Sequence, residues 1–364
     1  MQAQGYRIHA WGGPMRWEEW EVAPPGPGEV VIQVEACGIG LTVLNCMRGD
    51  LSNTAPLPRV PGHELVGRVV AVGAGVSLDR VGERVLGYFY LTCGECEPCR
   101  QGQDARCAHL AGWLGVHRDG GYGSYTVIPA ANALPIPETI DPVLATAIPD
   151  AIATPLHVCK TRLGLTPLDR VVVIGAGGGV GIHMVQMAHL FGAAVCGLDI
   201  DEEKFPAIQK AGGEPVLSRD WNAVALPLAW LGEPATAVID LIGSPESLGW
   251  SLSALGMGGS LAVLTTFRDQ SFPLEPRALV FRELRIVGSR YASKAEVLEA
   301  ARLVAEGRIT PVVSRVVKPD AIEQVHEALR HHTLLGRGAV RWPPPGQREQ
   351  AASAAAIPAK GQQE

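Results

Sequence analysis

A glycine-rich stretch between an apolar run and a helical pattern constrains the fold of this chain more than any other feature. Residues 175–181 read G-A-G-G-G-V-G and directly follow the run Val171–Ile174. Such a wholly apolar run is typical of a parallel strand buried on both faces. Val180–Phe191 then predicts a helix, and Ala194–Leu198 predicts the next strand. The stretch therefore predicts the strand–loop–helix–strand unit of a doubly wound parallel sheet.

The loop of this unit predicts a dinucleotide site. Glycines let the backbone approach a pyrophosphate, and the helix N-terminus offers free N–H groups and a positive dipole. Asp199 ends the second strand, 24 residues after Gly175 (199 − 175), where a carboxylate accepts the ribose hydroxyls and repels a 2′-phosphate. NAD(H) is therefore the expected cofactor. The expected cofactor-binding residues are Gly175, Gly178, Gly179, Val180, Gly181 and Asp199. The alternative is a structural glycine turn beside a surface aspartate.

The rest of the chain divides into two kinds of pattern. The first 150 residues contain short strands bounded by Gly and Pro, such as Leu65–Val72. Further strands of the parallel sheet are expected at Ala237–Leu241, Leu261–Leu264 and Leu284–Val287, with helices at Lys294–Glu306 and Asp320–His331. A chain of 364 residues is long enough for two domains. Residues 343–364 are rich in Pro, Ala and Gln and predict a flexible tail.

Composition and charge exclude several classes of protein. A net charge of −6 argues against a nucleic-acid or anionic-membrane partner. The N-terminus has no apolar segment of the signal-peptide kind, and no apolar run reaches transmembrane length. We therefore expect a cytoplasmic protein. In that compartment eight cysteines indicate metal ligands or free thiols rather than disulfides.

Four of the cysteines have the spacing of a metal site. Cys93, Cys96, Cys99 and Cys107 form the pattern C-x2-C-x2-C-x7-C, which lets four thiolates converge on one tetrahedral ion. Such a site is closed to water and staples a loop. Four free thiols or an iron–sulfur cluster are the alternatives, although the x7 interval is not that of a common iron–sulfur run. A structural zinc is the prediction, and the other four cysteines are expected to be buried thiols.

Together these motifs resemble the zinc-containing medium-chain alcohol dehydrogenase family. The resemblance covers residues 5–342 and rests on Gly62-His63-Glu64 with the following strand, the four cysteines, the glycine loop and Asp199. It implies a GroES-like β-rich catalytic domain around an inserted Rossmann domain, with the active site between them. The implied division is 1–153 with 294–342 for the catalytic domain and 154–293 for the Rossmann domain. It also implies a homodimer or homotetramer acting on a small molecule.

The chain departs from the family at one ligand of the catalytic zinc. The resemblance assigns His63 and Asp150 to the second and third ligand positions, with Glu64 beside them. The first position, a cysteine in the family, is occupied by Gly40, which has no donor atom. A catalytic zinc on His63 and Asp150 is therefore expected to be weak or absent. Asp150 as a helix N-cap and His63 as a core histidine are the structural alternatives.

Three functions follow from this reading. The first is an NAD-dependent alcohol dehydrogenase or carbonyl reductase, in which Thr42 keeps the hydroxyl that usually bonds the substrate oxygen, with His63, Glu64 and Asp150 as the other catalytic candidates. The second is a zinc-independent reductase of activated C=C bonds, such as enones or enoyl thioesters. The third is a catalytically silent NAD-binding protein.

Overall fold

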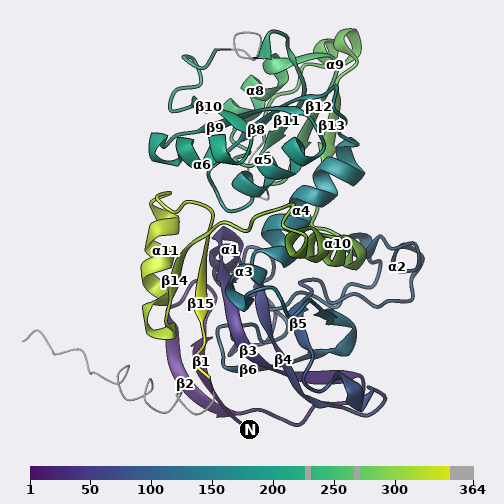
Figure 1. Ribbon diagram of the computed structural model, residues 1–364, viewed down its shortest axis with the longest axis vertical. Coiled ribbons are helices and arrows are strands. Elements are labelled where there is room, and N and C mark those ends of the chain that lie inside the picture. Colours follow the sequence, from purple (N-terminus) through teal and green to yellow (C-terminus); the bar gives the residue numbers. More distant parts are fainter. Residues whose placement is uncertain (226–230, 266–270, 345–364) are drawn as a thin grey trace, which may run out of the picture.

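The computed structural model describes residues 1–225, 231–265 and 271–344. These residues form two lobes joined by a helical segment, with the parallel sheet in one lobe and a mixed sheet in the other (Figure 1). The last strands of the chain join the mixed sheet, which also contains strands from the N-terminal part, so both ends of the described chain lie in the same half of the molecule.

The upper lobe in Figure 1 is built on a six-stranded sheet of order β10-β9-β8-β11-β12-β13, in which every pair is parallel. Its central strand β8 is buried at Val171, Val172, Val173 and Ile174 because helices cover both faces. The strands are β8 (Arg170–Ile174), β9 (Ala194–Asp199), β10 (Gly213–Leu217), β11 (Ala235–Asp240), β12 (Leu255–Val263) and β13 (Arg285–Gly288). The helices of this lobe are α5 (Gly181–Leu190), α6 (Phe205–Lys210), α8 (Pro245–Ala254) and α9 (Pro276–Arg282).

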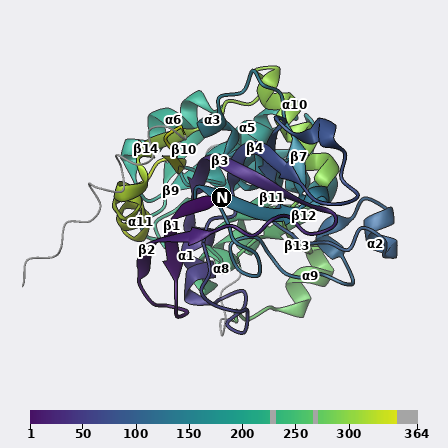
Figure 2. The same ribbon diagram turned by 90° about the horizontal axis from the view of Figure 1, so that it is seen from below.

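The other lobe contains a seven-stranded sheet. Six strands follow the order β14-β15-β3-β4-β5-β7, and β6 pairs with the first half of β3. A separate hairpin of β1 and β2 lies beside it (Figure 2). The strands are β1 (Gln2–Ile8), β2 (Met15–Glu21), β3 (Glu29–Ile39), β4 (Leu65–Val72), β5 (Arg84–Gly87), β6 (Tyr125–Pro129), β7 (Ala133–Pro135), β14 (Val313–Val317) and β15 (Arg337–Arg341).

The helices of this lobe are short and surround the sheet. They are α1 (Leu41–Arg48), α2 (Glu97–Arg100), α3 (Pro142–Ala145), α10 (Lys294–Ala305) and α11 (Ile322–Arg330), with single turns η1 (Leu78–Arg80), η2 (Asp104–Arg106), η3 (Ala130–Asn132) and η7 (Pro319–Ala321). A further single turn, η6 (Glu202–Lys204), belongs to the upper lobe. Helix α10 begins with a capping box, in which Ser293 and Glu296 bond each other's backbone N–H groups.

A helical rod that changes its winding connects the lobes. It runs through η4 (Ile148–Ile152), α4 (Ala153–Leu156) and η5 (His157–Leu163), of which the outer two are π-helical. Pro155 within the rod has no N–H to donate to the preceding turn, which favours a wider winding on either side. Asp150 lies in the first π-helical turn, a winding that occurs often at functional sites.

The structure agrees with the predicted fold class and refines the predicted elements. The expected strand Leu65–Val72 is β4, whereas Leu261–Leu264 is only the end of the longer strand β12. The sequence hides the first half of β12 because glycines at 256, 258 and 259 interrupt the apolar run. The expected helix Asp320–His331 opens with the tight turn η7 and becomes α-helical only at Ile322.

The domain boundaries at 153/154 and 293/294 remain a prediction. The first would fall within α4, and the second at the start of α10. The predicted flexible tail lies outside the described residues from position 345 on. No helix in the described parts of the chain is long and apolar enough to cross a membrane.

Candidate active site

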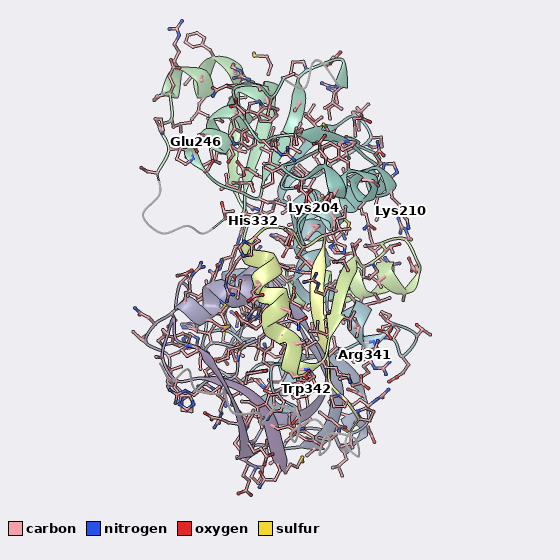
Figure 3. All side chains as sticks on the ribbon, turned by 90° about the vertical axis from the view of Figure 1, so that its left-hand side faces the viewer. Lys204, Lys210, Glu246, His332, Arg341 and Trp342 are labelled. Atoms are coloured by element: carbon pink, nitrogen blue, oxygen red, sulfur yellow. The ribbon has the colours of Figure 1, made fainter. Side chains whose placement is uncertain are left out.

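A cleft of about 1180 Å³ opens between the two lobes. All six residues predicted to bind a dinucleotide line it, from the end of β8, the start of α5 and the end of β9. The opposite wall is formed by α1, the connecting rod and the start of β15, and includes Thr42, Asp150 and Arg337. Lys204 and His332 lie where the lobes meet, with Lys204 Nζ donating to the His332 carbonyl oxygen over 2.7 Å (Figure 3).

The glycine loop brings β8 and α5 close together. A Cβ atom on Gly181 would lie 2.0 Å from the carbonyl oxygen of Gly175, so only glycine fits there. Val180, the N-cap residue of α5, has no side-chain acceptor for the N–H groups of the first turn, and the helix N-terminus faces the cleft. Unpaired helical N–H groups at such a position suit an anion such as a pyrophosphate.

Asp199 is held in place by the loop that it follows. Its carboxylate accepts hydrogen bonds from the Gly177 N–H (2.8 Å) and the Asp201 N–H (3.1 Å), and Lys204 Nζ lies 3.8 Å away. The side chain is buried yet reaches the cleft. This geometry presents a fixed carboxylate at the edge of the dinucleotide loop.

The four predicted zinc-binding cysteines converge. Their sulfur atoms all lie within 4.8 Å of one another, with Cys93–Cys107 at 3.6 Å and Cys96–Cys107 at 3.9 Å. A tetrahedron with Zn–S bonds of about 2.3 Å has edges of about 3.8 Å, so the spacing fits zinc. Backbone N–H groups lower the pKa of Cys96 to about 6, whereas burial raises the pKa of Cys99 to about 12, so the sulfur geometry is what supports a metal here. The residues present therefore fit one closed, four-thiolate zinc site.

His63, Glu64 and Asp150 also come together. Their potential ligand atoms lie within 4.8 Å of one another, and His63 Nε2 is 3.6 Å from Asp150 Oδ2. Glu64 is fully buried and His63 nearly so. Burial raises the pKa of Glu64, with Arg337 opposing that effect. Asp150 does not cap a helix, since its Oδ1 accepts from the Thr154 hydroxyl (2.9 Å) within the rod.

Arg337 completes this cluster, and sequence reasoning missed it. Its Nη2 atom lies 2.8 Å from Glu64 Oε1 and donates to Asp150 Oδ2 over 3.0 Å. Although burial opposes a low value, the nearby His63 ring, 3.6 Å away, and the charge of Arg337 hold the pKa of Asp150 well below its usual range. The sequence offered only an indirect signal for it: if Glu64 and Asp150 are buried without a metal, a cationic side chain must lie beside them.

Arg337 weighs against a catalytic zinc of the family kind. His63 Nε2 and both Glu64 oxygens are buried without a hydrogen-bond partner among the described residues, which taken alone suits a metal. However, a dication on Glu64 and Asp150 would lie within a few ångströms of the guanidinium. Each pair of like unit charges at that range costs about 4 kcal/mol at an effective dielectric constant of about 20. The same ion would also attract the two carboxylates, so this repulsion and the missing thiolate at position 40 weaken the zinc site but do not abolish it.

The remaining cysteines do not supply the missing ligand. Cys37 lies on β3 with its sulfur packed toward Gly62 and Gly121, and it is fully buried. Burial also raises the pKa of Cys46, on α1, to about 12. Among the described residues neither belongs to the cluster of His63, Glu64 and Asp150. Thr42, in contrast, lies on α1 in the wall of the cleft, as its predicted role requires.

Comparison with known proteins gives the same assignment. Residues 26–138 match the family model described as "Alcohol dehydrogenase GroES-like domain", and residues 179–306 match "Zinc-binding dehydrogenase". An acryloyl-coenzyme A reductase from Metallosphaera sedula is 30% identical over 90% of this chain and 96% of its own length. The chain belongs to the zinc-containing medium-chain alcohol dehydrogenase family.

Other members of this family show how widely the similarity extends. An alcohol dehydrogenase from Geobacillus stearothermophilus is 30% identical over 85% of this chain and 90% of its own. The solved structure of an NAD-dependent alcohol dehydrogenase superposes with a TM-score of 0.85, at 31% identity, over 93% of this chain and 99% of the other. That of AibC gives 0.86 at 27% identity, over 94% and 96%. These matches confirm the predicted family, its fold and the oxidoreductase class.

Proposed function

We propose that this chain transfers a hydride between NAD(H) and an alcohol or carbonyl substrate in the cleft between its lobes. The observation that carries the proposal is that one cleft holds both sets of residues: the glycine loop and Asp199 line one side, and Thr42 lines the other. A bound NADH supplies the hydride. The protein then has to bind the cofactor, orient the substrate oxygen and move one proton.

The dinucleotide loop performs the first task. The N-terminus of α5 offers N–H groups to the pyrophosphate, and Asp199 accepts the ribose hydroxyls. Because the backbone N–H groups of Gly177 and Asp201 hold the Asp199 carboxylate in place, a 2′-phosphate would meet a fixed negative charge. These contacts support NAD(H) rather than NADP(H).

Thr42 is the residue that we assign to the substrate. Its hydroxyl, on the first turn of α1, donates to the carbonyl oxygen, gives its proton to the alkoxide that forms as hydride arrives, and takes a replacement proton from water in the open cleft. Thr42→Val keeps the shape and removes the hydroxyl, and should lower kcat/KM for NADH-dependent reduction by about 10²-fold or more. The matched control is Thr54→Val, an exposed threonine outside the cleft. Equal rates for both variants would remove Thr42 from the reaction.

A second candidate is reduction of an activated C=C bond. The Arg337 cation, with Gly40 in place of a thiolate, favours it, because an enolate formed by hydride addition needs hydrogen bonds rather than a metal. The similarity to an acryloyl-coenzyme A reductase supports it further. A panel of ketones, aldehydes, enones and enoyl thioesters with NADH separates the two chemistries. Tight NADH binding without turnover of any of them would instead support a catalytically silent NAD-binding protein.

We also propose that the four-cysteine lobe holds one structural zinc, and that the protein is a cytoplasmic homodimer or homotetramer. The sulfur spacing supports the zinc. Metal analysis of dialysed protein tests it, and iron in place of zinc would contradict it. Light scattering after size-exclusion chromatography tests the assembly, and a mass of one chain, 38.5 kDa, would contradict it.

A further inference from the structure

Five arginine and lysine side chains line the cleft in the described part of the chain. Four of them pair with a carboxylate at 3.8 Å or less: Arg48 with Asp50, Lys204 with Asp199, Arg219 with Glu202 and Arg337 with Glu64. Arg290, the fifth, forms no ion pair with any described residue. A positive charge that faces a cleft without a counter-ion attracts anionic ligands.

Arg290 is nevertheless held in a defined orientation by Tyr90. Its Nε–H donates to the Tyr90 hydroxyl oxygen over 3.0 Å, and its Cζ atom lies 4.8 Å from the centre of the Tyr90 ring. The N–H groups of its two Nη atoms have no hydrogen-bond partner among the described residues. The end of the guanidinium is therefore free to bind a carboxylate through two parallel N–H bonds.

The support under Arg290 is itself fixed. Tyr90 stacks on Tyr291, with the ring centroids 4.8 Å apart and the planes 19° from parallel, and Trp113 meets its edge. Tyr291 directly follows Arg290 and has φ +50°, a left-handed conformation that is costly for a residue other than glycine. Such strained residues occur often at ligand sites, where the surrounding contacts hold them in place. The buried Tyr291 ring thus fixes the turn from which Arg290 reaches the cleft.

Aromatic contacts connect this cation to the cluster around His63. The His63 ring contacts Phe89 at 4.4 Å between centroids, and Phe89 contacts Tyr90 at 5.3 Å. Phe89, Tyr90 and Arg290 all line the same cleft as Thr42. The cleft therefore offers rings that can pack against the body of a substrate, with a cation beyond them for a charged end.

We propose that Arg290 binds a carboxylate of the substrate, so that the substrate is a carbonyl compound or an enone that carries a carboxylate group apart from its reacting carbon. The inference rests on the proposed hydride transfer in this cleft and names the class of substrate. One guanidinium without a counter-ion balances one carboxylate, whereas a phosphate dianion would leave an excess negative charge beside the rings. Thr42 then bonds the reacting oxygen while Arg290 holds the far end.

The test is the binding of two unreactive probes to the protein loaded with NADH, measured by calorimetry. Terephthalamate carries one carboxylate, and terephthalamide is its neutral analogue, so the ratio of their dissociation constants measures recognition of the charge. The wild type should bind terephthalamate at least about fivefold more tightly, a modest factor because Arg290 is exposed to water. Arg290→Gln should bind the two probes equally and keep its affinity for NADH.

Arg285→Gln is the matched control. Arg285 lies on β13 outside the cleft, where its Nε–H donates to the Ser260 hydroxyl oxygen over 3.0 Å, so the variant should keep the wild-type ratio. Tyr90→Phe removes the hydroxyl that holds Arg290 Nε and should lower the ratio without abolishing it. Arg290→Lys keeps the charge without the paired N–H groups and should also retain part of the preference.

Turnover gives a second readout. In NADH-dependent reduction, para-formylbenzoate should have a higher kcat/KM than its methyl ester, and Arg290→Gln should remove that preference. A charge preference in binding that depends on Arg290 supports the carboxylate site even if neither aldehyde is reduced, which separates this inference from the proposed function.

Three results would overturn the proposal. The first is an equal ratio of dissociation constants in the wild type and a folded Arg290→Gln variant. The second is a loss of NADH affinity in that variant, which would assign Arg290 to the cofactor. The third is tighter binding of para-phosphonobenzamide than of terephthalamate, which would replace the carboxylate by a phosphate-like group.

Discussion

Acidification below pH 6.5 is expected to destabilise this protein through His183. The ring lies fully buried on α5, where Nδ1–H donates to the Gly179 carbonyl oxygen (2.7 Å) and Nε2 accepts from the Val312 N–H (2.9 Å). These partners fix the neutral tautomer, since a proton on Nε2 would break the bond to Val312. Burial lowers the pKa of His183 from 6.5 to about 4.

The magnitude follows from this shift. Above pH 6.5 the ring is neutral in both the folded and the unfolded state, so His183 adds no pH dependence. As the pH falls below 6.5, His183 binds a proton in the unfolded state but not in the folded state. The free energy of unfolding therefore decreases until the pH reaches the pKa of His183 in the folded state. A shift of 2.5 units (6.5 − 4) corresponds to about 3 kcal/mol in full, and to about 2 kcal/mol by pH 5.

The assay is urea unfolding at about pH 7 and about pH 5, with the change in unfolding free energy compared between variants. His183→Gln cannot titrate, so its loss between the two values should be smaller than that of the wild type by about 2 kcal/mol. His189→Gln, exposed on the same helix, controls for the loss of a histidine and should behave as the wild type does. If His183→Gln and the wild type lose the same free energy, His183 is not the group that titrates and the reasoning is refuted.

Three further outcomes are expected. Cys107→Ser should abolish the zinc retained by the wild type and make the loop around α2 sensitive to protease, because the metal supplies much of its folding energy; unchanged zinc content would contradict this. Asp199→Ala should raise the affinity for NADPH relative to NADH by about tenfold or more in a binding titration, and an unchanged ratio would show that Asp199 does not face the 2′ position. Glu296→Gln should cost about 1–2 kcal/mol of unfolding free energy near pH 7. Burial by itself would raise the pKa of Glu296, but hydrogen bonds from His157, Thr161 and the Ser293 N–H lower it to about 2, so its contribution is present above about pH 4.5 and is lost as the pH falls towards 2. Calorimetry across that range should show the variant losing less stability than the wild type, and parallel curves would contradict the assignment.

Local patterns were enough to predict the dinucleotide site and the four-cysteine cluster. The loop at 175–181 lies between two elements whose periodicities are clear, and the four cysteines are at most 14 residues apart (107 − 93). In both cases the chain itself holds the functional groups close together. The residues predicted from such segments therefore line the cleft or converge in space.

Arg337 could not be predicted in the same way. It lies 297 residues from Gly40 (337 − 40), and no spacing in the sequence connects the two positions. The contact exists because β15 pairs with the end of β3, Gly338 opposite Ile39, which places the preceding arginine beside Gly40. The sequence showed that a ligand was missing at position 40, but only the folded sheet shows which group fills the space.

The pairing of β15 with β3 also bears on how the chain is made. Glu64 leaves the ribosome 273 residues before Arg337 (337 − 64), and Ile39 of β3 is made 299 residues before its partner Gly338 (338 − 39). The strands of the parallel sheet, β8 to β13, are all complete before that. A nascent chain therefore carries a finished nucleotide-binding lobe beside an N-terminal lobe with an open strand edge and an acid that lacks its counter-ion. Premature termination before residue 337 leaves the N-terminal lobe in that state. Only when β15 has been made can the edge of β3 be paired and the charge of Glu64 be neutralised by Arg337.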